Sequence, residues 1–383
     1  MNPPTIMLSF FRALVILFFP TFLKVDEEYF ELDLVEDGIN VNAEYFELDL
    51  LEDYMNNVQV QEDEPHRDEG DGHSDQVAAV NVSEWFEQQI DYEVKWCLAL
   101  NSVDFQEASE FQKLTVLSTK RFGKALVIDG HLQNTELDEY IYHESLVHPA
   151  LPKTVFIMGG GGGSAAREVL KHKDIEKVII CDIDRGIANL IREHMKANHE
   201  AFNDLRLRMV YNDAKYELEN SEEKFDVILG DLPDPNESGP NHLYTKSFYE
   251  NVAKPKLKDN GLFVTQAGRA GIFTHNAVFS PIYNTLKQVF TYVVAYTALV
   301  PSYGDSCGWI MASNEPINLD AEQLNKRIGE RIRGELGYLD GPVIAASTVL
   351  NKTLKNSLVE ETRILTEENV NVGSVRKRGV LNY

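Results

Sequence analysis

Two carboxylates separated by two residues lie in the sequence Asp231-Leu232-Pro233-Asp234-Pro235. One carboxylate can take a proton from a protonated amine, while the second holds a neighbouring ammonium group in place. A substrate with several amines needs both functions, because alkyl amines are protonated near pH 7 and have pKa values close to that of lysine. The pair therefore indicates chemistry on a polyamine rather than ordinary methyl transfer.

Five consecutive glycines, Gly159 to Gly163, follow an apolar run over residues 155–158. Glycine lets the main chain approach a ligand closely, so a glycine loop between a strand and a helix is a candidate ligand loop. Ser164 stands where we expect the N-cap of the following helix. The loop fits the pattern G-x-G-x-x-G poorly, because Ser164, Ala165 and Ala166 occupy its last part. A sulfonium nucleoside is therefore favoured over NAD.

Three further apolar segments end in polar residues. Segment 178–181 ends in Asp182, about 20 residues past the glycines, the spacing at which a carboxylate binds the ribose hydroxyls of a nucleoside. Segment 207–210 precedes Asp213 and Ala214, and segment 225–229 leads into Asp231. Taken singly, Asp182 or Asp213 is better explained as a helix cap. Together the segments predict an α/β fold with a Rossmann-like, methyltransferase-type sheet, whose strands end at a nucleoside site.

Composition and pattern divide the chain into four expected parts. These are an N-terminal extension over residues 1–80, hydrophobic and then acidic and disordered; a small N-terminal β domain over 81–135; a Rossmann-like catalytic domain over 136–317; and a C-terminal helical segment and tail over 318–383. Within them we expect strands at 114–117, 125–128, 262–265, 292–299 and 309–312, and helices at 278–290 and 320–336. Another helix is expected to start at 243–249 and to end near Lys258, with Asn260-Gly261 as its stop signal.

The net charge of −25 is concentrated near the N-terminus. Residues 26–75 hold 19 acids and the single base Arg67, or −18, which leaves −7 for the rest of the chain. A mildly acidic globular part argues against a nucleic-acid partner. The acidic stretch repeats one heptapeptide at 28–34 and 44–50. We expect disorder there or, alternatively, a partner-binding motif used twice.

The three cysteines, Cys97, Cys181 and Cys307, are odd in number and widely spaced, so neither a disulfide framework nor a zinc site is expected. A reducing compartment, the cytoplasm, fits best. Residues 7–23 are hydrophobic, but Arg12 interrupts them, no basic region precedes them and no small-residue cleavage site follows. A membrane anchor or a secretory signal stays open as the alternative.

Residues 85–313 resemble the polyamine aminopropyltransferases, the spermidine and spermine synthase family. The most specific motifs are Val127-Ile128-Asp129-Gly130, Asp138 to Glu144, the glycine loop, Asp231 to Pro235, and Tyr244 to Tyr249. Within the family, the sequence around Gly230-Asp231-Leu232, residues 263–268 and Gly308-Trp309 looks most like that of the plant thermospermine synthases.

The resemblance implies transfer of an aminopropyl group from decarboxylated S-adenosylmethionine to a polyamine, with methylthioadenosine released. The nucleoside is a co-substrate and not a permanently bound cofactor, and spermidine is the implied acceptor, giving thermospermine. No metal is implied, because the sulfonium leaving group is already activated by its charge. A homo-oligomer, either dimer or tetramer, is also implied.

The resemblance also implies roles for individual residues by motif position. The implied catalytic residues are Asp231 as proton acceptor, with Tyr142 and Asp234. The implied nucleoside contacts are Gln112, Gln133, Gly159, Gly161, Asp182, Asp213 and Ala214. The implied polyamine groove is lined by Tyr142, His143, Asp234 and Tyr303.

One position departs from the family in a way that bears on catalysis. The family carries Asp or Glu in the middle of the glycine loop, facing the amine of the aminopropyl group, whereas this chain has Gly162. An ammonium left without its anion in a closed site costs several kcal/mol. We therefore hypothesise weaker donor binding and reduced or absent turnover. Leu137, Arg269 and Cys307 also replace residues usual in the family, which are Arg, Pro and an aromatic residue.

Three hypotheses follow from these observations. The first is an active aminopropyltransferase, and the second is a catalytically impaired paralogue that binds ligand or partner without turnover. The third is a methyltransferase on the same sheet, which the paired carboxylates and the N-terminal β domain disfavour. Release of methylthioadenosine, rather than S-adenosylhomocysteine, separates the first hypothesis from the third.

Overall fold

The computed structural model describes residues 25–26, 29–30, 85–91, 93–150, 153–235, 239–371 and 380–382. It divides into two units, Met1–Ala78 and Ala79–Tyr383. In the first unit, strands β1 (Val25–Asp26) and β2 (Tyr29–Phe30) pair antiparallel. The hydrophobic segment 7–23, most of the acidic repeat and the basic residues 376–378 lie outside the described residues. All other described elements belong to the second unit.

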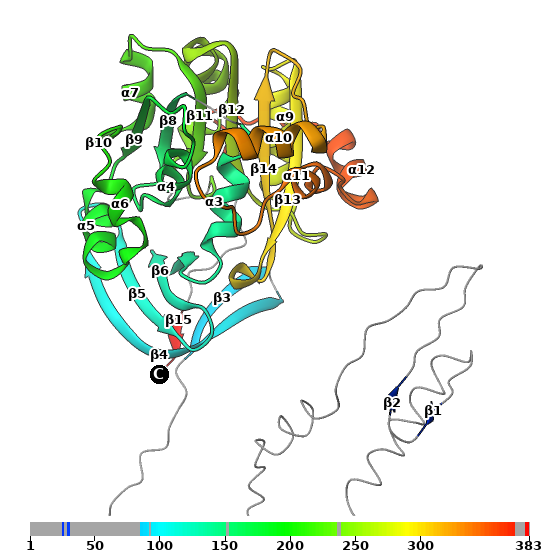
Figure 1. Ribbon diagram of the computed structural model, residues 1–383. Helices are drawn as coiled ribbons and strands as arrows, with labels where there is room; N and C mark the ends of the chain where they lie inside the picture. The colour runs from blue at the N-terminus through cyan, green and yellow to red at the C-terminus, as the bar shows by residue number, and fades with distance from the viewer. Residues whose placement is uncertain are drawn as a thin grey trace, which may run out of the picture. The chain divides into compact units, whose positions relative to one another are not determined.

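The larger sheet of the second unit has seven strands in the order β10-β9-β8-β11-β12-β14-β13. The five strands from β10 to β12 run parallel, and β14 is antiparallel to both of its neighbours. Parallel strands are covered on both faces, which explains their nearly continuous apolar runs. The predicted Rossmann-like, methyltransferase-type sheet is confirmed (Figure 1). The strands are β8 (Thr154–Gly159), β9 (Lys177–Asp182), β10 (Leu207–Tyr211), β11 (Phe225–Asp231), β12 (Leu257–Arg269), β13 (Tyr292–Val300) and β14 (Asp305–Ser313).

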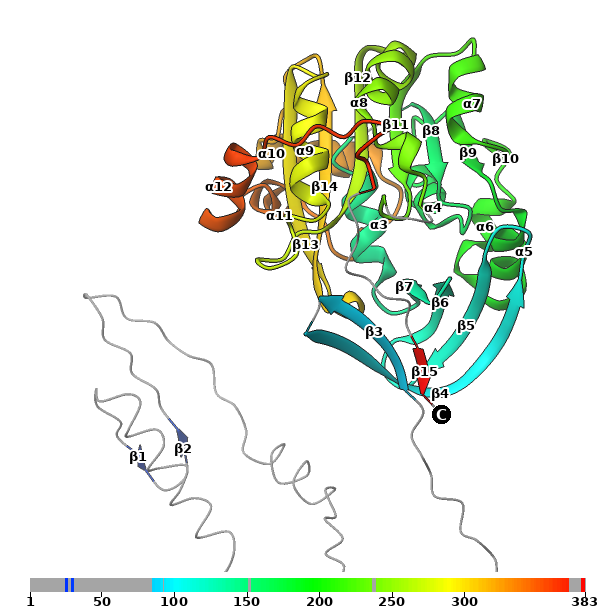
Figure 2. The same cartoon turned by 180° about the vertical axis from the view of Figure 1, so that it is seen from behind.

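Helices cover both faces of this sheet, as Figures 1 and 2 show from opposite sides. One face carries α3 (Glu139–Val147) and α4 (Ser164–Leu170), whose apolar residues share a core with the sheet. The other face carries α7 (Ala214–Asn220), α9 (Phe279–Lys287) and α12 (Lys352–Glu360) around a second core. Helices α10 (Ala321–Arg331) and α11 (Gly341–Ser347) pack on each other. Of the described helices, none is both long enough and apolar enough to cross a membrane.

The smaller sheet is antiparallel, in the order β15-β3-β4-β5-β6-β7. Strand β15 (Val380–Asn382) brings residues from the end of the chain beside β3 (Trp85–Asp91) (Figure 1). The predicted turn at Asp129-Gly130 joins β6 to β7, and both residues have positive φ, 49° and 78°. Helix α5 (Arg185–His194) packs on this sheet through Ile187, Leu190 and Ile191. The other strands are β4 (Val94–Ala108), β5 (Lys113–Thr119), β6 (Gly123–Ile128) and β7 (His131–Thr135).

Three local predictions are wrong. The N-cap of α4 is Gly163, with φ 85°, and Ser164 is already the first helical residue. The helix expected from 243 to 258 is instead a series of short pieces: η2 (Asn241–Leu243), α8 (Lys246–Phe248), the π-helical turn η3 (Tyr249–Ala253) and η4 (Lys254–Lys256). The expected stop signal Asn260-Gly261 lies within β12, in a register shift between the pairs Phe225–Leu257 and Val227–Leu262 of β11 and β12.

Candidate active site

A cavity of about 520 Å³ opens at the carboxyl ends of β8, β9 and β11. This is the switch point of the sheet. From β8 the chain continues to β9 and β10 on one side, and it then crosses to β11 on the other side of β8. The small sheet contributes lining residues from β6 and β7. All twelve predicted site residues line this one cavity, although their roles in binding stay predictions: Gln112, Gln133, Tyr142, His143, Gly159, Gly161, Asp182, Asp213, Ala214, Asp231, Asp234 and Tyr303.

The glycine loop follows β8 and forms part of the cavity floor. Gly159, Gly160 and Gly163 have positive φ, and a Cβ on Gly161 would lie 2.8 Å from the Asp182 carboxylate. A side chain is therefore excluded at four positions of the loop. Gly162 differs, because its φ is not positive and a Cβ there would meet only Ile191, at 3.8 Å. The backbone thus has room for a side chain at the position where the resemblance expects an acid.

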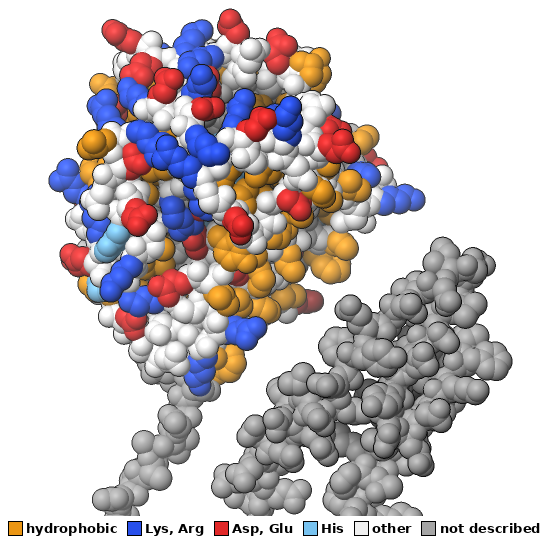
Figure 3. Space-filling model, viewed as in Figure 1, with side chains coloured by type: hydrophobic (Ala, Val, Ile, Leu, Met, Phe, Trp, Pro, Cys, Tyr) orange, Lys and Arg blue, Asp and Glu red, His pale blue; other side chains and the backbone are white. Residues whose placement is uncertain are grey.

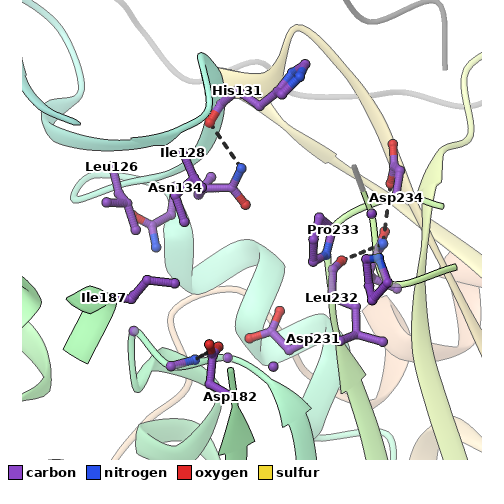
Figure 4. A pocket seen from close by; sticks show the side chains of 18 of the residues that line it. Leu126, Ile128, His131, Asn134, Asp182, Ile187, Asp231, Leu232, Pro233 and Asp234 are labelled. Carbon is purple, nitrogen blue, oxygen red and sulfur yellow. Dashed lines mark hydrogen bonds between the residues drawn. The ribbon is translucent and has the colours of Figure 1, made fainter. Parts of the chain in front are cut away.

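Asp182 ends β9 beside the glycine loop (Figure 4). Its Oδ2 accepts a hydrogen bond from the amide of Gly161 at 2.9 Å, and its Oδ1 accepts one from the amide of Asp184 at 2.8 Å. Burial raises the pKa of Asp182, and these amides oppose the rise by favouring the carboxylate. The carboxylate thus fixes the position of the loop that a nucleoside would contact.

Asp184 is a residue that sequence reasoning missed. Its Oδ2 accepts hydrogen bonds from Gln112 Nε2 at 2.9 Å and from Ser109 Oγ at 2.6 Å, while Oδ1 caps α5. Asp184 therefore holds the predicted nucleoside contact Gln112 across 72 residues of sequence. The pattern Cys181-Asp182-Ile183-Asp184, two carboxylates directly after a strand, was the available signal.

Asp213 serves as both a helix cap and a cavity residue. Its Oδ1 accepts a hydrogen bond from the amide of Tyr216 at 2.8 Å, which caps α7. Its Oδ2 lies 2.8 Å from Nε2 of His242, another lining residue. Asp213 therefore caps a helix and lines the cavity, and its contact with a nucleoside stays a prediction.

Asp231 is the last residue of β11 and is held by two side chains of α3. The hydroxyl of Tyr142 donates a hydrogen bond to Oδ1 at 3.3 Å, and Nε2 of His143 lies 4.0 Å from Oδ2. Burial raises the pKa of Asp231, while His143 and the Tyr142 hydrogen bond oppose the rise. A general base works best when its pKa is close to the ambient pH. This carboxylate can therefore accept a proton from an amine in the cavity.

The Asp234 end of the same loop is held by Gln266, which sequence reasoning did not select. Nε2 of Gln266 donates to Oδ1 of Asp234 at 3.3 Å and to the carbonyl of Leu232 at 2.6 Å. The Tyr244 hydroxyl, 2.7 Å from the same Nε2, donates to the carbonyl of Pro233 at 3.1 Å. Hydrogen bonds from Gln266 and Tyr244 therefore hold the loop that carries both carboxylates. Leu126, Ile128 and Ile187 form an apolar wall on the opposite side of the cavity (Figure 4).

Tyr303 reaches the cavity from the turn η5 (Pro301–Tyr303), and its hydroxyl donates to the carbonyl of Gln133. Buried Asp138 holds this turn by accepting hydrogen bonds from the amide of Ser302 at 2.7 Å and from its hydroxyl at 2.9 Å. The Tyr142 ring packs edge-on to the Tyr303 ring, with centroids 6.1 Å apart. Two aromatic rings thus line the cavity near Asp231.

This sheet, with a cavity at its switch point, is typical of transferases that take a group from a nucleoside. Residues 136–321 match the spermine/spermidine synthase domain, and residues 84–136 match the spermidine synthase tetramerisation domain. The chain therefore belongs to the spermine/spermidine synthase family, whose members are aminopropyltransferases.

Several relatives and solved structures share most of their length with this chain. The thermospermine synthase ACAULIS5 of Arabidopsis thaliana is 56% identical over 291 residues, 74% of this chain and 86% of its own. A polyamine aminopropyltransferase of Sulfurisphaera tokodaii is 38% identical over 71% of this chain and 92% of its own. A spermidine synthase in complex with the transition-state analogue AdoDATO superposes with a TM-score of 0.67 at 28% identity, covering 73% of this chain and 96% of its own. The Thermotoga maritima spermidine synthase gives 0.65 at 28% identity, covering 73% and 94%.

Proposed function

We propose that the enzyme transfers the aminopropyl group of decarboxylated S-adenosylmethionine to spermidine and so forms thermospermine and methylthioadenosine. The observation that carries the proposal is the placement of Asp231, partly buried beside Tyr142 and His143, in the same cavity as the glycine loop and Asp182. The 56% identity to a thermospermine synthase supports spermidine as the acceptor.

The proposed reaction is an in-line displacement. An amine nitrogen of spermidine attacks the methylene carbon bonded to the sulfonium, the carbon–sulfur bond breaks, and its electron pair neutralises the sulfur of methylthioadenosine. The attacking amine arrives protonated near pH 7 and must lose a proton, which Asp231 accepts. The protein otherwise contributes by holding the two reactants in line.

The two substrates are proposed to occupy different parts of the cavity. The glycine loop, Asp182, Asp213 and Gln112 would hold the nucleoside, since they lie at the ends of β8 to β10 and beside α5. The polyamine would lie along Tyr142, His143, Asp234 and Tyr303. Asp234 can pair with an ammonium group that keeps its proton.

We further propose a homo-oligomer, a dimer or tetramer, that acts in the cytoplasm. The match of residues 84–136 to a tetramerisation domain supports assembly. On the face in Figure 3, hydrophobic side chains gather over the region of β13 and α11, as an interface between copies requires. Three free thiols, Cys97, Cys181 and Cys307, fit a reducing compartment.

The alternative, an impaired paralogue, is motivated by Gly162 and, to a lesser degree, by the departures at Leu137, Arg269 and Cys307. Product analysis tests the proposal against it. The full chain is incubated with spermidine and decarboxylated S-adenosylmethionine, with S-adenosylmethionine as the control donor, and thermospermine is separated from spermine. Thermospermine formed with the decarboxylated donor is the expected result. Spermine alone would overturn the regiochemistry, and no product would favour the paralogue.

A further inference from the structure

Arg167 is a partly buried side chain of α4, behind the glycine loop, that reaches three acceptors at once. Nη2 of Arg167 lies 2.6 Å from Oε1 of Glu139 in α3, and its Nη1 donates to Oδ1 of Asn198 at 2.9 Å. Nε donates to Oε1 of Glu168 at 3.0 Å. A planar guanidinium presents its donors in fixed directions, so these contacts fix the relative positions of their partners.

The first branch from Arg167 leads to the proton acceptor. Glu139 Oε2 lies 2.6 Å from Nδ1 of His143, whose Nε2 lies 4.0 Å from Asp231. Burial alone would lower the pKa of His143, but the hydrogen bond and the charge of Glu139 outweigh it, so the pKa is raised. The His143 imidazole therefore lies between Glu139 and Asp231, and Glu139 contacts both Arg167 and His143.

The second branch leads to the nucleoside loop. Nδ2 of Asn198, which is 4% exposed, donates to the carbonyl of Gly162 at 2.8 Å and to Oγ of Ser164 at 2.9 Å. The Cβ position of Gly162 touches only Ile191, so side-chain packing does not fix the loop there. The Asn198 amide does, and Arg167 sets where that amide points.

We propose that Arg167 is a positioning residue that holds the Gly162 part of the nucleoside loop at a fixed separation from the His143–Asp231 pair. The inference rests on the proposed aminopropyl transfer. An in-line displacement depends steeply on the distance between the two reactants. Each reactant is set by one branch of Arg167, so the side chain controls their separation without touching either one.

Several charged and titratable groups face the two titrating residues, Asp231 and His143. Those that face Asp231 are Tyr142, His143 and Glu139 of α3, Asp182 of β9, and Tyr244. Those that face His143 are Glu139, Arg167 and Asp231. Loss of Glu139 therefore affects Asp231 mainly through His143, the nearer charge.

The test compares Arg167→Met, Arg167→Lys and Asn198→Ala with a matched control, Lys171→Met. Lys171 pairs with the same Glu168, at 2.6 Å, but does not contact the loop or Glu139. The first three variants should raise the KM for the nucleoside donor and the Kd for methylthioadenosine about tenfold or more, the size expected for one lost charge-assisted bond. Lys171→Met should leave both unchanged.

A second arm uses Glu139→Gln, which keeps the size of the side chain and removes its charge. Removing this charge lowers the pKa of His143 and weakens its effect on Asp231, so the acid limb of the kcat/KM profile should move to higher pH, while methylthioadenosine binds as in the wild type. The inference is overturned if Arg167→Met and Asn198→Ala only lower Tm, as Lys171→Met can, or if the Glu139→Gln limb moves to lower pH. A wild type that binds methylthioadenosine without turnover would defeat the proposed function alone; one that does not bind it would overturn both.

Discussion

The hydroxyl of Tyr142 donates a hydrogen bond to Oδ1 of Asp231 across 3.3 Å, from the second turn of α3 to the end of β11. The Tyr142 ring also packs against the Trp309 ring, with centroids 5.4 Å apart, and this packing fixes the position of the Tyr142 hydroxyl. Burial raises the pKa of Tyr142 well above its usual range, and so the phenol stays a donor. The carboxylate of Asp231 is thereby oriented toward the cavity.

Tyr142→Phe should lower kcat/KM about tenfold, the size of one lost hydrogen bond to a charged group. The variant keeps the ring and its packing, so its Tm should stay near that of the wild type. In the wild type this hydrogen bond lowers the pKa of Asp231, so its loss should raise that pKa and move the acid limb of the pH profile to higher pH. An acid limb that does not move would show that Asp231 is not the group titrated.

Gly162→Glu should raise activity at least about tenfold, because an anion facing the donor ammonium offsets a cost of several kcal/mol. The backbone accepts the change, since its φ is not positive and the Cβ position is open. Gly162→Gln is the control for size without charge. Gly161→Ala should instead reduce nucleoside binding, because its Cβ would lie 2.8 Å from Asp182. Equal activity of Gly162→Glu and the wild type would refute the hypothesis that the missing acid limits turnover.

His172 should make the protein sensitive to acid. It is 1% exposed, with Nε2 3.0 Å from Nδ1 of His148. Burial, together with the charges of His148 and Arg331, lowers the pKa of His172 from 6.5 to about 3. Between these values the unfolded chain binds the proton and the folded chain does not. The free energy of unfolding therefore falls as the pH drops through this window, with a slope of up to about 1.4 kcal/mol per pH unit.

Urea unfolding of the wild type and of His172→Gln between pH 6.5 and 4 measures this slope. The variant should show a shallower decline of the unfolding free energy. His199→Gln, at an exposed histidine, should leave the slope as it is in the wild type. Parallel curves for wild type and His172→Gln would show that this histidine does not titrate as stated.

The main sheet could be predicted because β8, β9 and β11 are mostly apolar runs that end in Gly159, Asp182 and Asp231. Strand β4, 15 residues long, was missed because its second half carries mostly polar, exposed side chains that do not alternate. Pairing with β5 holds that half in place, and pairing is not visible in a local pattern. The π-helical turn after Phe248 was missed for a similar reason, since only packing distinguishes it from an α-helix.

The residues that contact the cavity could be selected from strand ends and motifs, but those that hold them could not. Gln266 on Asp234, Asp184 on Gln112 and Asp138 on Ser302 join positions from 32 to 164 residues apart. Such partners are decided by how the sheets and helices pack. A local sequence pattern does not show which distant residues come into contact in the folded chain.

In the proposed mechanism, Asp231 accepts the proton of the attacking amine. Single-turnover release of methylthioadenosine is measured for the wild type, Asp231→Asn and the control Asp226→Asn, on the same strand and paired with Lys258 at 2.9 Å outside the cavity. Asp231→Asn should slow the chemical step by about a hundredfold or more, the contribution of a general base, while Asp226→Asn should react like the wild type. An Asp231→Asn variant that releases methylthioadenosine at the wild-type rate would contradict the mechanism.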